Sequence, residues 1–563
     1  MGGPRTIPEA LCDAARTDEG YTFVVGHVET RRSYAELQDR GRRVARALRD
    51  AGLRRGDLVG LVIADAESFL TALFGASIAG LVPASLYPPT TTIGDMSRYF
   101  ALTTGILRAS GARAVVASAS LTAGFESLRG TCPELAMVLS RDDLDAPPFE
   151  PDILPSLDDL AFVQFTSGST AVPKGVALSH RNVSANVDAI NGPAGLGTTA
   201  EDSAVSWLPL YHDMGLVGMA LGPLYSARPG VLLTPQAFVK RPADWLKAIS
   251  RHKATVSFAP NFAYDLAVRR VKDRDLEGLD LSSWRVAGCG AEPIHAPTLA
   301  AFAERFRSVG FRASSFLPSY GLAEHVLAAT FPVRGREPHI EHLSAEDLTE
   351  RRRATRVQAG ESAVTLVGCG VALPGHEIRI VGEDGHVVAE REVGEITLAG
   401  PSVMVGYYKN ARLTAETIQD GWLHTGDLGY LSAGELFVCG RVKDLIIVAG
   451  RKYHPQDLEW AVSDLPGIRR GRVVAFGTAV QGASDRVIVV VEPSGTTSGE
   501  SLTDAIRQRI SEAFGLYVDE VVAVPSGTIG RTTSGKVQRS ATKAWYLRGA
   551  LLEETANEAG LPA

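Results

Sequence analysis

The sequence predicts an α/β protein with a large N-terminal domain and a small, mobile α+β domain at the C-terminal end. Short apolar strands alternate with amphipathic helices up to about residue 290, and after residue 394 short strands and turns dominate. Strands and helices alternate again from about residue 442. A chain of 563 residues is also too long for one ordinary hydrophobic core, so more than one domain is expected.

The first half of the chain has the pattern of parallel sheets covered by helices. Residues 34–51 and 66–78 have the apolar spacing of helices, and residues 58–63 (LVGLVI) form an apolar run typical of a buried strand. Further strands are expected at residues 114–116, 161–165, 204–207, 231–233 and 285–287. We therefore expect mixed, mostly parallel sheets with flanking helices.

The second half predicts a β-rich subdomain followed by a separate small domain. The segments GEITLAG, GELFVCG and DLIIVAG are short strands bounded by turn residues. The last block contains VVAFG, RVIVVVE and EVVAV, with helices expected at residues 455–464 and 502–514. These patterns predict an N-terminal domain over residues 1–440 and a C-terminal domain over residues 441–563.

Composition and charge exclude several classes of protein. The net charge of -7 and the isoelectric point near 6.0 give no indication of a nucleic-acid partner. Five scattered cysteines without CxxC spacing favour a reducing compartment over a disulfide framework. The first twenty residues lack the apolar centre of a secretory signal, and no long apolar run suggests a membrane span. We expect a cytoplasmic protein without integral membrane association.

A loop rich in hydroxyl groups and glycine follows the strand expected at residues 161–165. The segment FTSGSTAVPKG, residues 165–175, brings together Thr166, Ser167, Gly168, Ser169, Thr170 and Lys174. Glycine lets backbone N–H groups approach an anion closely, hydroxyls donate hydrogen bonds, and lysine adds a positive charge. The segment does not match the Walker pattern. It predicts a polyphosphate-binding loop, and the alternative for such a segment alone is a polar surface hairpin.

This loop resembles the phosphate-binding loop of the adenylate-forming superfamily. That superfamily includes acyl-CoA synthetases, peptide-synthetase adenylation domains, luciferases and fatty acyl-AMP ligases. Its other motifs follow in the same order: WLPLYHDMG at 207–215, GCGAEP at 288–293, SYGLAE at 319–324, WLHTGD at 422–427, GRVKD at 440–444 and SGK at 534–536. The resemblance covers nearly the whole chain and implies an ATP-dependent ligase that joins a carboxylate to AMP.

The resemblance implies a role for each matching residue. Beside the phosphate loop, the nucleotide would contact Gly290, Ala291, Glu292, Ser319, Tyr320, Gly321, Asp427 and Arg441. The acyl substrate would contact His212, Asp213, Met219 and Phe262. The implied catalytic residues are Lys536, His212 and Glu324, with Glu324 as the Mg²⁺ ligand and Lys443 as the hinge between domains.

These roles suit the side chains. Tyr320 offers a flat ring on which adenine can stack. Glu324 provides a hard oxygen ligand of the kind that Mg²⁺ prefers. Asp427 can accept hydrogen bonds from ribose hydroxyls. Lys536 would meet the negative charge that develops between the carboxylate and the α-phosphate.

Three details resemble the fatty acyl-AMP ligase branch. LYPP at 86–89, LPLYHDMGL at 208–216 and PNFAYDL at 260–266 are similar to that branch's versions of common segments. The segment GRVKDLIIVAGRKYHPQDLE at 440–459 resembles its hinge region, with Lys452 where asparagine is more usual. A polar tract at about residues 332–360 lies where this branch carries an insertion, which in the family is associated with disfavouring the conformation that accepts free coenzyme A. An uninvolved surface excursion is the alternative for that tract.

The implied reaction has two halves. A fatty acid and ATP give an acyl-adenylate and pyrophosphate, and the acyl group then passes to the phosphopantetheine thiol of an acyl carrier protein. No carrier motif of the GxDS type follows Lys536, so the carrier is expected to act in trans.

Three other interpretations stay open at this point. One is an acyl-CoA synthetase. Another is an amino-acid or aryl-acid adenylation enzyme, because Asp213 lies near the position where such domains place an aspartate for the substrate ammonium. The third is a catalytically inactive adenylate-binding protein, against which the intact Lys174, Glu324, Asp427 and Lys536 argue.

Overall fold

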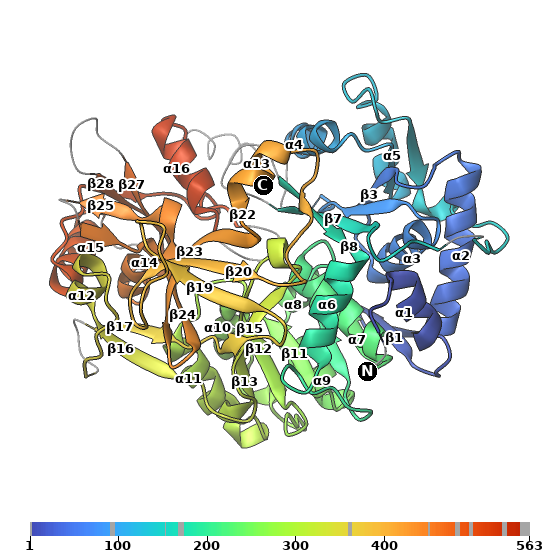
Figure 1. The fold of residues 1–563 in the computed structure, drawn as a ribbon. Coiled ribbons are helices and arrows are strands. Elements are labelled where there is room, and N and C mark those ends of the chain that lie inside the picture. The colour runs from blue at the N-terminus through green and yellow to red at the C-terminus, as the bar shows by residue number, and fades with distance from the viewer. Residues whose placement is uncertain are drawn as a thin grey trace, which may run out of the picture.

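A computed structural model describes residues 3–89, 96–151, 154–166, 174–358, 363–448, 451–478, 485–494, 499–531 and 537–551 (Figure 1). Of the predicted site residues, Ser167, Gly168, Ser169, Thr170 and Lys536 lie outside the described residues. For Thr166 only the backbone is described.

The first large sheet has seven strands in the order β21-β8-β7-β4-β3-β5-β6. Its strands are β3 (Leu58–Val62), β4 (Val82–Ser85), β5 (Ala114–Ala117), β6 (Met137–Ser140), β7 (Leu160–Thr166), β8 (Lys174–Ser179) and β21 (Gly406–Tyr407). Strands β6, β5, β3, β4 and β7 run parallel, whereas β8 and β21 are antiparallel additions at one edge. The helices of this half are α1 (Ile7–Ala14), α2 (Tyr34–Asp50), α3 (Ala66–Ile78), α4 (Met96–Ser110), α5 (Ala119–Glu126) and α6 (His180–Asn191).

The second large sheet has seven strands in the order β13-β12-β11-β9-β10-β1-β2. Its strands are β1 (Gly20–Val25), β2 (Val28–Ser33), β9 (Ala204–Ser206), β10 (Gly230–Leu233), β11 (Val256–Ala259), β12 (Val286–Cys289) and β13 (Phe316–Pro318), and only β2 is antiparallel to its neighbour. The associated helices are α7 (Gly222–Ser226), α8 (Pro235–Lys240), α9 (Ala243–Arg251), α10 (Asn261–Arg270) and α11 (Ala296–Phe306). Fully buried Trp245, Tyr264 and Trp284 fill the core here.

A β-rich region follows the second sheet. It contains β14 (Tyr320–Gly321), β15 (Ala328–Phe331), β16 (Ile340–Ser344), α12 (Ala345–Glu350), β17 (Ala363–Val367), β18 (Val371–Ala372), β19 (Glu377–Val381), β20 (Gly394–Ala399), α13 (Ala411–Thr417), β22 (Ile418–Gln419), β23 (Trp422–Ser432) and β24 (Glu435–Arg441). Strands β19, β20, β23 and β22 form one sheet, and β24 pairs with β23.

The last elements pack around their own apolar cores. They are β25 (Ile446–Val448), β26 (Arg451–Tyr453), α14 (Pro455–Ser463), β27 (Ile468–Thr478), β28 (Arg486–Pro493), α15 (Gly499–Phe514), β29 (Glu520–Ala523) and α16 (Arg539–Leu547). Alternate residues of β28 face opposite sides: Val487 and Val489 join one buried cluster, and Ile488 and Val490 join another.

The predicted α/β class, with mostly parallel sheets and a β-rich subdomain, is confirmed. Helix α3 has the predicted bounds, because Asp65 caps its first turn by accepting a hydrogen bond from the backbone of Ser68. The strand expected at 285–287 instead spans Val286–Cys289, and the Arg285 side chain just before it belongs to a polar network. In the described part of the chain, no helix has the length and apolarity that a membrane span requires.

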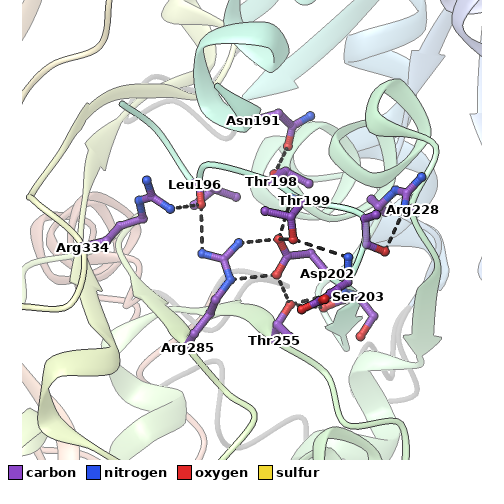
Figure 2. A network of polar contacts seen from close by, with 12 residues as sticks. Asn191, Leu196, Thr198, Thr199, Asp202, Ser203, Arg228, Thr255, Arg285 and Arg334 are labelled. Atoms are coloured by element: carbon purple, nitrogen blue, oxygen red, sulfur yellow. Dashed lines mark hydrogen bonds and ion pairs between the residues drawn. The ribbon is translucent and has the colours of Figure 1, made fainter. Parts of the chain in front are cut away.

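Asp202 is the centre of that polar network, at the amino ends of β9, β11 and β12 (Figure 2). Its two carboxylate oxygens accept hydrogen bonds at 2.7 Å from Nε and Nη2 of Arg285. The Thr255 hydroxyl and the Thr199 backbone N–H donate to the same carboxylate, each at 2.7 Å. These donors outweigh the effect of burial and lower the pKa of Asp202 to about 2.

We predict that Asp202→Asn destabilises the protein by about 2 kcal/mol at pH 7, because the depressed pKa measures how strongly folding favours the ionised form. This contribution is present above the unfolded pKa of Asp, and it is lost as pH falls from about 4 to about 2. Denaturant unfolding of wild type and variant should therefore differ most at neutral pH and converge in acid. Glu201→Gln, at the exposed neighbouring position, is the matched control. An equal difference at pH 7 and pH 2 would contradict the assignment.

Candidate active site

Several predicted motifs follow the carboxyl ends of strands in the second sheet. The segment with His212 follows β9, Gly290 follows β12, and Ser319 follows β13. Because these strands are parallel, their carboxyl ends meet at one edge of the sheet, where α/β proteins commonly bind ligands. The predicted phosphate loop follows β7 of the first sheet and leads into β8 at Lys174.

Tyr320, Asp427 and Arg441 form one hydrogen-bonded chain. The Tyr320 hydroxyl donates to Oδ2 of Asp427 at 2.8 Å, and Nε of Arg441 donates to Oδ1 at 2.6 Å. Burial, together with the Asp427 charge, raises the pKa of Tyr320, and the same carboxylate raises the pKa of Arg441. A carboxylate has about four acceptor positions, so Asp427 keeps two for a ligand.

The backbone around Gly290 and Ser319 leaves no room for a larger residue. A Cβ at Gly290 would lie 2.8 Å from the Ser319 carbonyl oxygen, and the Ser319 N–H donates to the Cys289 carbonyl at 2.8 Å. Ala291 has a positive φ of 68°, which is uncommon for a residue other than glycine. The predicted adenine segment therefore has a tightly constrained backbone beside Tyr320.

Glu324 and Lys174 are brought together by Tyr407, which the sequence analysis did not identify. The Tyr407 hydroxyl donates to Oε1 of Glu324 at 2.8 Å, and Nζ of Lys174 lies 5.1 Å from the centre of the Tyr407 ring. Burial, and secondarily the Glu324 charge, raises the pKa of Tyr407. The lysine at the end of the predicted phosphate loop thus lies near the predicted metal ligand.

His212 and Asp213 lie at the start of a π-helix, Met214–Leu221. Nδ1 of His212 is 2.6 Å from Oδ1 of Asp213, and that oxygen also accepts the Met214 N–H at 2.7 Å. With the proton on Nδ1, the Nε2 atom of His212 is left as an acceptor. Met219 is buried within this helix. π-Helical turns occur frequently at functional sites.

Phe262 belongs to an aromatic cluster and is half-buried. Its ring centroid lies 6.1 Å from that of Trp207 and 6.4 Å from that of Phe238, both in edge-on arrangements. The Phe262 backbone N–H, at the start of α10, donates to Oε1 of Glu292 at 2.6 Å. Glu292 therefore joins the predicted nucleotide motif to the predicted acyl residue, a contact that motif matching alone did not indicate.

A cavity of about 120 Å³ lies away from these residues. Phe23, Ile63, Leu208, Leu210, Tyr211 and Leu232 are among its lining residues. It borders the segment before His212, but the lining includes none of the acyl residues predicted from the sequence. The Phe262 cluster, rather than this cavity, is therefore our candidate acyl site.

Arg531 connects the C-terminal elements to the Phe262 cluster. Its guanidinium carbon lies 5.9 Å from the centre of the Phe262 ring, and it is also held by the Gly471 carbonyl. Arg531 and Val537, which flank the segment containing Lys536, form an antiparallel β-bridge. The base of the predicted catalytic-lysine loop thus lies at the predicted acyl site.

The predicted hinge residue Lys443 lies close enough to Arg441 and Lys174 for their charges to affect its pKa. Burial is the main cause that lowers its pKa, and the positive charges of Arg441 and Lys174 lower it further. Next to it, Oδ2 of Asp444 accepts a hydrogen bond from Arg539 at 3.0 Å, and Arg539 also pairs with both carboxylate oxygens of Glu459. The predicted hinge is therefore tied to the helix that follows the lysine loop.

The polar tract predicted as an insertion is a β-hairpin with a short helix. Strands β16 and β17 pair antiparallel, and α12 lies between them in sequence and contacts β26 of the C-terminal elements. Glu341 of β16 is 1% exposed and contacts Arg391 at 3.0 Å, the Tyr430 hydroxyl at 2.8 Å and Arg356. Glu341 therefore anchors the start of the tract to the β-rich region.

The donor set around Glu324 suits a magnesium ion held mainly by phosphate. Within the described ranges, no three His, Cys, Asp or Glu side chains are grouped so as to hold a metal ion. Mg²⁺ is usually bound by one or two carboxylates, waters and substrate phosphates rather than by an all-protein cage. One half-exposed carboxylate, bonded to the tyrosine whose ring Lys174 also contacts, fits that chemistry.

The chain is similar in sequence to two protein families and to several known proteins. A family model described as AMP-binding enzyme matches residues 11–408, and a model described as Disco-interacting protein 2-like, AMP domain, matches residues 443–556. A Caulobacter vibrioides protein with the provisional name acyl-CoA synthetase is 38% identical over 97% of this chain and 96% of its own length. A medium-chain-fatty-acid–acyl-carrier-protein ligase of Moorena producens is 34% identical over 92% of this chain and 90% of its own.

One solved structure extends the likeness to the fold. It comes from structural and functional studies of fatty acyl-adenylate ligases from E. coli and L. pneumophila. It superimposes with a TM-score of 0.91 at 38% identity, over 97% of this chain and 98% of that chain.

We predict that Glu341→Gln loosens the hairpin of β16 and β17. Hydrogen bonds from Arg391, Arg356 and Tyr430 outweigh burial and lower the pKa of Glu341 to about 2, which corresponds to about 3 kcal/mol in favour of the folded ionised form. Hydrogen exchange of the hairpin amides should therefore accelerate by about a hundredfold. Glu346→Gln, an exposed carboxylate in the same tract, should leave the exchange unchanged. Equal protection in both variants would show that Glu341 does not anchor the hairpin.

Proposed function

Because the chain belongs to the AMP-binding enzyme family, we propose that it is a fatty acyl-AMP ligase that uses ATP to activate a fatty acid. In the second half-reaction the phosphopantetheine thiol of an acyl carrier protein, acting in trans, attacks the acyl-adenylate, forms a thioester and releases AMP. The observation that carries the proposal is the position of Arg531 over Phe262, because it brings the base of the Lys536 loop to the candidate acyl site.

The first half-reaction is an in-line attack of the fatty carboxylate on the α-phosphorus of ATP, with pyrophosphate as the leaving group. Asp427 would accept hydrogen bonds from the ribose hydroxyls while Tyr320 and Arg441 hold its carboxylate in place. Lys174 would contact the phosphates, and His212 would orient the acid. Lys536 would stabilise the charge that develops on the bridging oxygen; such preorganised donors are worth roughly 3–4 kcal/mol in comparable sites. Glu324 would hold Mg²⁺, which supplies charge neutralisation at the phosphates when bound.

The second half-reaction requires a different orientation of the C-terminal domain, for which we propose a rotation of residues 441–563 about Lys443. In the orientation described here the polar tract contacts that domain. Glu350 of the tract pairs with Arg451 at 2.7 Å, and Glu383 pairs with both Lys452 and the tract residue Arg352 at 2.5 Å. These contacts favour the orientation described here. A free-energy difference of about 1.4 kcal/mol already changes the ratio of two conformations tenfold.

The proposal predicts efficient acyl-AMP formation, efficient transfer to holo carrier protein and little acyl-CoA. Mass spectrometry of acyl-adenylates across C2 to C18 acids tests the first half, with saturating ATP. A thioester assay that offers either coenzyme A or holo carrier protein then tests the second half with one fatty acid. The same assay with Glu350→Ala plus Glu383→Ala tests the tract. These changes break the direct pair of Glu350 with Arg451 and the link from Arg352 through Glu383 to Lys452, but they keep the Glu341 anchor. The double variant should form more acyl-CoA at an unchanged rate of pyrophosphate release.

The outcomes separate the candidate functions. Efficient acyl-CoA formation by the wild type would favour an acyl-CoA synthetase, the activity in the provisional name of the Caulobacter relative. A best substrate with an α-amino group would favour an adenylation enzyme. The absence of any acyl-adenylate would favour a binding protein. Glu377→Ala, an exposed carboxylate on β19, is the control for the double variant.

We predict that Asp427→Ala weakens ATP binding by about 10- to 150-fold, because the lost hydrogen bonds to a charged acceptor cost about 1.5–3 kcal/mol. These hydrogen bonds form before the chemistry, so the loss should appear in calorimetric titration with ATP as well as in the reaction rate. Asp39→Ala on the exposed face of α2 is the control. Unchanged ATP affinity in Asp427→Ala would show that the ribose does not bind to this carboxylate.

A further inference from the structure

We infer that Tyr407 is a positioning residue that holds Glu324 for the metal and Lys174 for the phosphates. The inference rests on the proposed function and adds to it a residue outside the matched motifs. Tyr407 lies between a carboxylate and an ammonium group that would act on the same polyphosphate. It uses a different part of its side chain for each of them.

The hydroxyl of Tyr407 fixes the carboxylate. It donates to Oε1 of Glu324 at 2.8 Å, so this oxygen is held in one direction while Oε2 is left to accept other ligands. Hydrogen bonds to a metal-binding carboxylate orient it and tune its affinity, and removing such a partner commonly costs 10- to 100-fold in metal affinity. Glu324 is therefore oriented before any metal binds.

The ring of Tyr407 holds the lysine. Nζ of Lys174 lies 5.1 Å from the ring centre, within the range of a cation–π interaction. Lys174 and Glu324 have opposite charges, and a direct pair would compete with the phosphates for both of them. Contact with the phenol instead leaves the ammonium donors and one carboxylate oxygen available.

The backbone makes Tyr407 a rigid support. In the pairing of β21 with β8, Tyr407 lies opposite Val176, two residues after Lys174. The Tyr408 N–H donates to the Gly175 carbonyl at 2.7 Å, and the Met404 N–H donates to the Glu324 carbonyl at 2.9 Å. The segment that carries Tyr407 is thus bonded to the backbone next to Lys174 and to that of Glu324.

The backbone of Tyr407 is also held by α13, which follows it in the chain. The Tyr407 N–H donates to the Thr414 hydroxyl at 2.9 Å, and Tyr407 is only 7% exposed. Gly406 before it has a φ of 152°, and a Cβ there would lie 2.7 Å from the Thr414 side chain. This close approach requires glycine at 406 and leaves Tyr407 little freedom to turn away from Glu324.

The test is calorimetric titration of the full chain with ATP, once with Mg²⁺ and once with excess EDTA. Tyr407→Phe keeps the ring and removes the hydroxyl. It should lower the affinity for MgATP by about tenfold and leave the affinity for metal-free ATP unchanged. Tyr407→Leu also removes the ring. In this variant the binding of metal-free ATP should be weakened as well, by about two- to fivefold, which is the contribution of one cation–π contact. Pyrophosphate exchange with Tyr407→Phe should need more Mg²⁺ to reach half its maximum.

Two controls separate this inference from the proposed function. Tyr408→Phe removes a hydroxyl from the adjacent half-buried tyrosine and should behave as wild type. Glu324→Gln should abolish the gain in affinity from Mg²⁺. If Mg²⁺ does not raise the ATP affinity of the wild type, the role of Glu324 in the proposed function is wrong. If Glu324→Gln loses the gain while Tyr407→Phe keeps it, only the inference about Tyr407 is overturned.

Discussion

The arrangement of the candidate site depends on the hydrogen bonds that the Asp427 carboxylate accepts. One oxygen accepts from Tyr320, which follows the second sheet, and the other accepts from Arg441 at the end of β24. The residues just before the predicted hinge are thereby bonded through one side chain to the predicted adenine segment. Neither partner could be lost without leaving a buried charge or hydroxyl unsatisfied, which is costly in a protein interior.

The sequence predicts the elements better than it predicts the contacts between them. Helix α3 and the buried strands follow from apolar periodicity and capping residues, which are local properties. The motifs likewise lie at strand ends, as an α/β pattern leads one to expect. Tyr407 was not predicted because its meaning depends on Glu324, 83 positions earlier, and on a two-residue strand too short to show any periodicity.

Glu341 and Arg531 show the same limit for charged residues. In sequence, Glu341 belongs to a polar tract and resembles solvated surface, but in the fold it is surrounded by two arginines and a tyrosine. Arg531 precedes the SGK motif by a few residues, and only the packing of the C-terminal elements places it over Phe262. Burial and ion pairing depend on the tertiary structure, so residue type alone does not reveal them.

The polar tract that contains β16 and α12 is held by different kinds of interaction on its two sides. Toward the N-terminal domain it is held by the buried Glu341, which water and salt cannot readily reach. Toward the C-terminal elements Glu350 pairs directly with the half-exposed Arg451, and Arg352 is linked to Lys452 through the exposed Glu383. Exposed pairs are typically worth only about 0–1 kcal/mol and are screened by salt. The tract therefore stays folded when those pairs break. A contact of this kind is reversible: if residues 441–563 rotate as proposed, it can bias their resting position and still be released and remade within every turnover.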